Sequence, residues 1–83
     1  MTILETIADL INQGDVENSL TLIIEHQDDY IEDAIYWNLR GLLCLIVEEF
    51  DSAVSCFETA LGIEPCNPDV YYNYGFALEK IGD

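Results

Sequence analysis

Few side chains in this sequence are of the types that carry catalysis or bind metals. The chain of 83 residues has one histidine, His26, and three cysteines, Cys44, Cys56 and Cys66. No two cysteines have the C-x-x-C spacing of a zinc or redox site, and His26 has no second histidine with which to share a metal. We expect three reduced thiols, two on helices and one in a turn, and a partly buried histidine that could respond to pH. These residues predict neither a metal nor a cofactor.

Two further groups of residues are candidates for chemistry. The acidic cluster at positions 28, 29, 32 and 33 lacks the glycine and the ligand spacing of a calcium-binding EF-hand, so we interpret it as a solvated connector. The serines at positions 19, 52 and 55 stand in no nucleophile-elbow motif, and the chain has no glycine-rich phosphate loop. The sequence therefore predicts a protein that is not an enzyme.

The charge balance narrows the classes of partner. Seventeen Asp and Glu residues stand against Arg40 and Lys80, for a formal net charge of −15. Because 51% of the residues are hydrophobic and regularly spaced, we expect an ordered acidic domain rather than a disordered chain. Phosphate contacts need clustered Lys and Arg, so nucleic acid and an anionic membrane surface are excluded as partners. A basic protein or peptide suits this charge, although a need for solubility or adaptation to high salt would also explain the acidic residues.

Targeting and membrane-spanning signals are not recognised in the sequence. Glu5 and Asp9 are incompatible with a secretory signal peptide at the N-terminus. The longest apolar run, Gly41 to Val47, has seven residues, whereas a membrane span needs about 20. Together with the unpaired cysteines, these features predict a cytoplasmic protein.

The spacing of apolar residues predicts an all-α protein with about five helices. Gly14 and Asp15 suit the end of one helix and the start of the next, and Pro65 follows the end of a later one. Glu48 and Glu49 must close the turn between the third and fourth helices without a glycine. The expected helices run from residue 3 to the break at 14–15, then over 16–27, 33–47 and 50–63, and from 68 to the Gly-Asp pair at 82–83.

The pattern of the central helices restarts at a fixed distance along the chain. Trp37 and Gly41 are matched by Tyr71 and Gly75, and we call this separation, from position 37 to position 71, the repeat interval. Two Gly-Asp pairs, at 14–15 and 82–83, are separated by twice the repeat interval. A fixed period of this length is typical of stacked helical units that cannot bury their apolar faces alone. The expected function shifts accordingly from catalysis to binding.

The best-defined unit carries, at fixed spacings, the residues Trp37, Arg40, Gly41, Cys44, Ala53, Phe57, Ala60 and Pro65. This stretch is similar to a tetratricopeptide repeat, whose pattern has Trp, Leu, Gly, Tyr, Ala, Phe, Ala and Pro at those positions. Arg40 replaces the usual Leu, and Cys44 replaces the usual Tyr. The same positions of the flanking units hold Ile3, Thr6, Ile7, Leu10, Ser19 and Ile23 on one side and Tyr71, Tyr74, Gly75 and Leu78 on the other.

The resemblance implies a right-handed α-solenoid of antiparallel helix pairs, in a single domain that covers residues 1–83. Residues 1–33 would form a degenerate repeat, residues 34–67 the best-matching repeat, and residues 68–83 the first helix of a third repeat. We interpret this last helix as part of a truncated repeat rather than as a solvating cap.

The pattern also predicts which side chains pack between the helices. Gly41 and Ala53 are small where two helices approach closely, and Trp37 and Phe57 fill the space between helices. Arg40 should lie along the helix interface with its head near an acidic group. The residues expected to face the core further include Leu20, Ile23, Ile24 and Tyr71.

In the family, the first helix of each unit lines a concave groove in which ligands lie. Projected onto this chain, the groove contains Leu4, Ala8 and Ile11, then Ile35, Asn38, Leu42, Leu45 and Ile46, then Asp69, Tyr72, Phe76, Glu79 and Lys80. The predicted ligand contacts are Leu42, Leu45, Ile46, Tyr72 and Phe76, with Asn38 and Asn73 available to bond a ligand backbone. An acidic peptide C-terminus is excluded as the ligand, because the basic clamp that some relatives use is replaced here by Leu4, Ala8, Leu39 and Asp69, and only Asn73 is kept.

The groove is unusually apolar, and large exposed apolar patches mark interaction sites. We therefore expect a scaffold module that binds a basic or amphipathic peptide or helix. In the alternative interpretation, further C-terminal helices or a second copy of the chain cover the same residues. The alternatives are thus a homodimer formed through the groove, or the regulatory N-terminal region of a larger enzyme such as a transferase.

Overall fold

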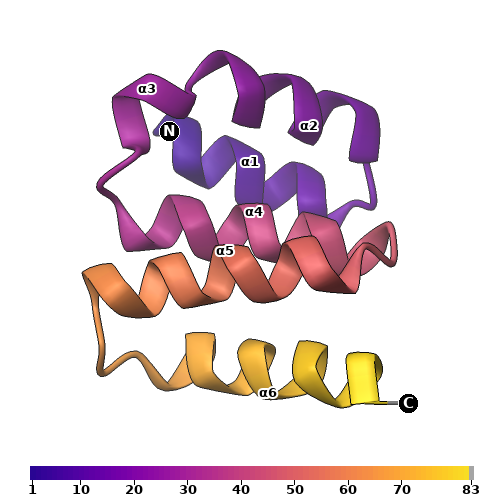
Figure 1. Ribbon diagram of the computed structural model, residues 1–83. Coiled ribbons are helices and arrows are strands. Elements are labelled where there is room, and N and C mark those ends of the chain that lie inside the picture. Colours follow the sequence, from indigo (N-terminus) through magenta and orange to yellow (C-terminus); the bar gives the residue numbers. More distant parts are fainter. Residues whose placement is uncertain (83) are drawn as a thin grey trace.

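The computed structural model describes residues 1–82 of the chain, and these form helices without any strand (Figure 1). The predicted all-α class is confirmed. The helices are α1 (Ile3–Asn12), α2 (Val16–Glu25), α3 (Gln27–Tyr30), α4 (Ala34–Ile46), α5 (Phe50–Ile63) and α6 (Pro68–Gly82). Asp83, which the predicted last segment includes, lies outside the described residues.

Local sequence explains where most helices begin. Thr2 and Glu5 form a capping box at the start of α1, in which each side chain accepts a hydrogen bond from the other residue's backbone N–H. Side-chain oxygens of Asp15, Asp33 and Asn67 accept backbone N–H bonds at the starts of α2, α4 and α6. These bonds satisfy donors that would otherwise lack a partner at each helix start.

The two tight interhelical turns use the left-handed backbone region. Gly14 has φ 75° between α1 and α2, and Glu48 has φ 61° between α4 and α5. The second value confirms that this turn closes without a glycine, at a conformational cost that glycine would not carry.

The prediction for residues 27–33 was wrong in its details. The second helix ends at Glu25 rather than at Gln27, and the short helix α3 occupies part of the expected connector. The ring of Tyr30 stacks on that of Tyr36, with centroids 6.2 Å apart. The separate helix α3, which follows α2 after His26, raises the number of described helices above the five expected.

Helix α4 lies at the centre of the arrangement and contacts α1, α2, α5 and α6 (Figure 1). It separates two hydrophobic clusters, and Trp37 packs against both. The first cluster, shared with α1 and α2, contains Ile7, Ile11, Ile23, Tyr36, Leu39 and Leu43. The second, shared with α5 and α6, contains Ala34, Ala53, Phe57, Ala60, Val70 and Ala77.

The close approach of α4 and α5 confirms the expected role of Gly41. A Cβ atom at position 41 would lie 2.5 Å from a ring carbon of Phe57, and Phe57 is fully buried. Ala53 is also fully buried, as predicted. Small residues thus set the distance between these two helices.

Three residues that were expected to face the core are on the surface. Leu20 and Ile24 are 45% and 63% exposed, and Tyr71 is 52% exposed. Helix α6 packs on α5 through Val70 and Ala77, so no helix of the described chain covers the side of α6 that carries Tyr71. Leu20 and Ile24 of α2 instead line an open pocket together with residues of α4 and α5.

None of the helices within residues 1–82 combines the length and the apolar character needed to cross a membrane.

Candidate functional site

The predicted contact residues line one side of α4 and the adjacent side of α6. Ile46, Tyr72 and Phe76 are exposed, and Tyr72 is the most open of them at 77%. Leu42 and Leu45 are half-buried rather than exposed. Leu42 packs against the first cluster, and Leu45 packs against the second. These two leucines therefore serve the core as well as the surface.

The two predicted asparagines lie together. Asn73 Nδ2 donates a hydrogen bond of 3.1 Å to Asn38 Oδ1, which links α6 to α4. This bond involves neither the side-chain amide N–H groups of Asn38 nor the side-chain carbonyl of Asn73. The pair can offer a ligand backbone one donor and one acceptor, the complement that a peptide group requires.

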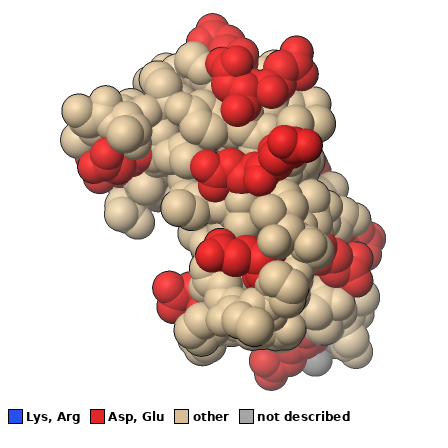
Figure 2. Space-filling view, turned by 90° about the vertical axis from the view of Figure 1, so that its left-hand side faces the viewer, with Lys and Arg blue, Asp and Glu red and all other residues tan. Residues whose placement is uncertain are grey.

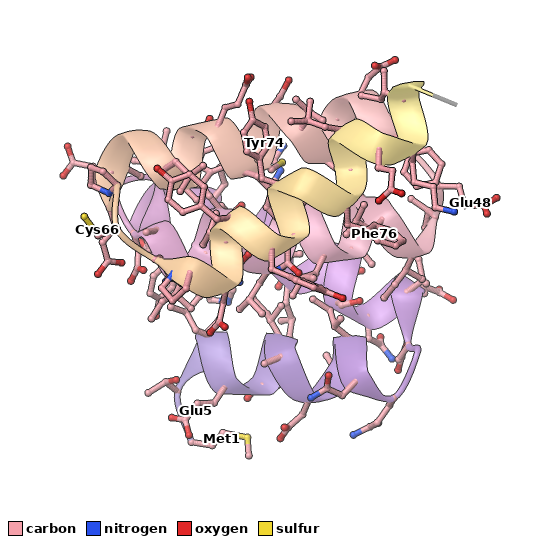
Figure 3. The ribbon with its side chains drawn as sticks, turned by 90° about the horizontal axis from the view of Figure 1, so that it is seen from below. Met1, Glu5, Glu48, Cys66, Tyr74 and Phe76 are labelled. Carbon is pink, nitrogen blue, oxygen red and sulfur yellow. The ribbon has the colours of Figure 1, made fainter. Side chains whose placement is uncertain are left out.

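These residues form what we call the α1–α6 groove, with α4 as its floor and α1 and α6 as its walls. In Figure 2, which looks along the helices, the left edge of the molecule is hollowed between the part formed by α1 and the part formed by α6. Figure 3 shows the molecule from the α6 end, with Tyr74 on the side of α6 that faces α5 and Phe76 on the side that faces α1. Leu4 and Ala8 of α1 and Ile35 of α4 also have exposed surface here.

Not every residue projected onto the groove is accessible. Ile11 is buried in the first cluster and cannot contact a ligand. Lys80 lies over the ring of Phe76, with its Nζ atom 5.4 Å from the ring centroid. Glu5 and Asp9 of α1 and Asp69 of α6 are exposed, and Figure 3 shows Glu5 on the side of α1 that points away from α6. Carboxylates dominate the charged surface in Figure 2.

A second concave surface, which the sequence did not predict, lies on the opposite side of α4. This α2–α5 pocket has a volume of about 480 Å³ and an open mouth. Its walls come from α2 and α5, and its floor from α4. It is lined by Val16, Leu20, Ile23, Ile24, Trp37, Arg40, Leu43, Cys44, Val47, Glu49, Ser52, Ser55, Cys56 and Thr59. The sequence did contain one indication of this pocket, because two of its lining residues, Arg40 and Cys44, depart from the repeat pattern.

Arg40 has different partners from those expected. Its Nη1 atom donates to Gln27 Oε1 at 3.0 Å and lies 3.4 Å from Tyr36 Oη, and no carboxylate of residues 1–82 lies within ion-pair distance of it. Its guanidinium lies 5.1 Å from the ring centroid of Trp37. The stacking and the neutral acceptor hold the cation at the pocket wall, where its charge is not cancelled by an acid.

The pocket also brings two cysteines from different helices together. Cys44 of α4 is half-buried and Cys56 of α5 is buried, both line the pocket, and neither is in a disulfide. The Cys56 thiol, with a smaller contribution from Arg40, lowers the pKa of Cys44 to about 7 against the opposing effects of burial and of Glu49. The interaction with Cys44, together with burial, raises the pKa of Cys56.

A third apolar surface is the outer face of α6. Tyr71 and Leu78 are exposed there, and Gly75 lies between them. Although Gly75 follows Gly41 by one repeat interval, a Cβ atom at position 75 would meet nothing within 4 Å. The site that Phe57 fills over Gly41 is thus open over Gly75.

The structure also bears on metal binding. Within residues 1–82, no group of three or more His, Cys, Asp or Glu side chains is arranged to hold a metal ion. The Nδ1 atom of His26 lies 3.6 Å from a carboxylate oxygen of Asp29, one turn along the chain.

No protein-family model matches the chain, and neither a curated protein nor a solved structure is significantly similar to it.

Proposed function

We propose that this chain is an interaction module of the tetratricopeptide type, which binds a basic amphipathic helix in the α1–α6 groove. The observation that carries the proposal is the exposed apolar surface of Ile46, Tyr72 and Phe76 in the groove, on a chain of net charge −15. An amphipathic helix with Lys and Arg beside its apolar face would match both features.

The repeat is supported by structural features that recur at the repeat interval. One such pair is Gly14 and Glu48, the two residues with left-handed backbone. Another is Asp33 and Asn67, whose side chains cap α4 and α6. Buried residues recur at the same interval in the pairs Ser19 and Ala53, Ile23 and Phe57, Tyr36 and Val70, and Leu43 and Ala77. In these pairs, equivalent positions have the same backbone or packing role, which is expected of a stack of similar units.

The groove residues divide into those that would contact a ligand and those that hold the floor. Ile46, Tyr72 and Phe76 expose enough apolar surface to act as anchors without serving the core. The joined amides of Asn38 and Asn73 would bond polar groups of the ligand. The net negative charge of the chain would attract the basic residues of the ligand and make the affinity depend on salt.

The test uses two fluorescein-labelled synthetic helices with the same leucine face, one with lysines and one with glutamates on the polar face. Fluorescence anisotropy should show binding of the lysine helix only, weakened by added salt. Tyr72→Ser and Ile46→Ser should each reduce the affinity about tenfold, since an apolar anchor is lost. Leu78→Ser removes a side chain on the outer face of α6 that is as exposed as that of Ile46, and it should leave the affinity unchanged.

Two results would overturn this proposal. One is failure of the lysine helix to bind at low salt. The other is an equal loss of affinity in Leu78→Ser and Tyr72→Ser, which would show general attraction to an acidic protein. Helicity measured by circular dichroism should be the same for all three variants, because the mutated side chains are exposed.

A second candidate function, self-association, is favoured by the outer face of α6. Tyr71, Gly75, Leu78 and Gly82 form one helical stripe that carries no charge. If two copies of α6 cross antiparallel about a twofold axis between residues 76 and 77, Tyr71 faces Gly82 of the other copy and Leu78 faces its Gly75. Large residues then meet glycines throughout, which is the self-complementarity that a twofold interface requires.

Two single helices bury little area, so this dimer would be weak, and screening of its negative charge by salt would strengthen it. Light scattering over a concentration series should show a dimer that Leu78→Asp disrupts and Tyr72→Asp does not. A chain that stays monomeric at high salt would contradict this candidate. Dimer loss in Tyr72→Asp alone would assign self-association to the groove instead.

A further inference from the structure

We propose that the α2–α5 pocket binds a small amphipathic anion, a carboxylate on an aliphatic tail, with Arg40 bonding the carboxylate and the apolar walls covering the tail. The pocket is separate from the α1–α6 groove, so this proposal does not depend on the function proposed for that groove. Its volume of about 480 Å³ lies within the range of about 300–1,000 Å³ that is usual for small-molecule sites.

The guanidinium of Arg40 has one nitrogen engaged and one edge free. Its Nη1 atom donates to Gln27 Oε1 at 3.0 Å and lies 3.4 Å from Tyr36 Oη. Neither Nε nor Nη2 is hydrogen-bonded to another group of residues 1–82. Since no buried side-chain nitrogen or oxygen in that range lacks a partner, these two atoms are accessible. The N–H groups of Nε and Nη2 form a planar fork that can bind both oxygens of a carboxylate.

The surroundings of this cation hold it in place and leave its charge uncompensated. The guanidinium lies 5.1 Å from the ring centroid of Trp37, and no carboxylate of residues 1–82 is within ion-pair distance of it. Gln27 and Tyr36, which engage Nη1, do not line the pocket, whereas Arg40 and Trp37 do. The unbonded edge is therefore the part of the guanidinium that is available to a ligand in the pocket.

The apolar walls of the pocket contain side chains that no described helix covers. Leu20 and Ile24 of α2 and Val47 at the end of α4 are exposed, and all three line the pocket. An aliphatic tail that lies over them removes their surface from water, which is the main driving force for binding an apolar group. A tail in this position also accounts for an apolar stripe on α2 that packs against no other helix.

The charges of the lining favour a carboxylate as the head group. Of the described residues that line the pocket, Arg40 is the only cation and Glu49 the only carboxylate. Glu49 and the net charge of −15 repel anions, so a dianionic phosphate is disfavoured relative to a carboxylate. An ammonium group is excluded, because the guanidinium is positively charged and offers only donors. A carboxylate uses both N–H groups of the fork at the cost of a single negative charge.

The experiment uses the fact that the chain has one arginine and one tryptophan, both of which line this pocket. Decanoate is titrated into the isotope-labelled whole chain below the concentration at which it forms micelles, and heteronuclear NMR spectra are recorded. We expect saturable binding, with a downfield shift of the Arg40 Nε–H proton and shifts at Leu20 and Ile24. Trp37 fluorescence should change over the same concentrations. Acetate, which lacks a tail, and decyltrimethylammonium, which has the opposite charge, should leave the Nε–H resonance in place.

Variants separate the contributions of the cation, the fork and the tail. Arg40→Met keeps an apolar stem and removes the cation, so it should weaken decanoate binding about tenfold or more. Decanol, which has the same tail without charge, should bind this variant and the wild type equally. Arg40→Lys keeps the charge without the fork and should also bind decanoate more weakly than the wild type. Ile24→Ser should weaken decanoate binding severalfold, whereas Leu78→Ser, which lies outside the pocket, should not.

The wild-type chain alone suffices for the NMR titration if a variant fails to fold. The proposal would be overturned if decanoate failed to bind at low salt, or if it bound without moving the Arg40 Nε–H resonance. Equal affinity of Arg40→Met and the wild type for decanoate would also contradict it, because that result would show an apolar pocket that does not recognise charge. An equal response to acetate would show attraction of any anion and would remove the role of the apolar walls.

Discussion

The ring of Phe57 occupies the space that a side chain at position 41 would need, whereas the equivalent space over Gly75 is empty. Two glycines at the same repeat position thus have opposite environments. Gly41 contacts Phe57 of the neighbouring helix α5, whereas Gly75 lies on a face of α6 that no described helix covers. The contrast shows that a repeated residue type does not by itself indicate a repeated contact.

The first prediction compares alanine at these two glycines. Gly41→Ala should lower the free energy of unfolding by about 1–2 kcal/mol, because the strain of overpacking against a buried ring exceeds the gain in helix propensity. Gly75→Ala should raise it by about 0.5–1 kcal/mol, since the new methyl group meets nothing and alanine favours the helix. Urea unfolding of both variants at low protein concentration measures the difference. A stabilising Gly41→Ala would mean that Phe57 is free to move.

The second prediction separates core from surface in the groove. Leu45→Asp should destabilise the fold by about 2–4 kcal/mol, because it places a carboxylate against the second hydrophobic cluster. Its neighbour Ile46 is exposed and ends α4, so Ile46→Asp should change stability by less than about 1 kcal/mol. Thermal unfolding followed by circular dichroism distinguishes the two. Equal losses would place Ile46 in the core and remove it as a ligand contact.

The third prediction concerns the hydrogen bond that joins α4 to α2. Tyr36 is fully buried, and its hydroxyl donates to the carbonyl of Ile23 at 2.7 Å. Tyr36→Phe should cost about 1–2 kcal/mol of stability, because it leaves that carbonyl without this partner and changes little else in the packing. Arg40, which lies 3.4 Å from the hydroxyl, should also become more mobile. Denaturant unfolding checks the first effect, and faster quenching of Trp37 fluorescence by an anionic quencher checks the second.

The fourth prediction is a pH dependence at the start of α2. Hydrogen bonds from the side chain and backbone of Asn18 lower the pKa of Asp15 below its ordinary value of 3.8. Ionised Asp15 therefore stabilises the fold fully above that value, and the contribution is lost as the pH falls through the lowered folded-state pKa. Asp15→Ala should thus be less stable than the wild type at pH 7 and approach it in strong acid. Asp15→Asn, which keeps a neutral cap, should show a smaller pH dependence in the same melting experiments.

Helix positions could be predicted well because their determinants are local. The caps at Asp15 and Asp33, the break at Gly14 and the end of α5 before Pro65 depend on residues within one turn of each boundary. The short helix α3 was missed because its four residues, Gln27–Tyr30, include only one apolar side chain and so show no helical apolar spacing.

The sequence by itself determined the helical class, most helix ends, the repeat interval and the close approach at Gly41, because backbone propensity and side-chain size act locally. Only the tertiary structure decided which helix faces are covered. It left Tyr71, Leu20 and Ile24 exposed, turned Arg40 toward Gln27 and placed Cys44 and Cys56 on the wall of one pocket. The physical reason is that an apolar stripe predicts burial against some surface, whereas its actual neighbour depends on how whole helices pack.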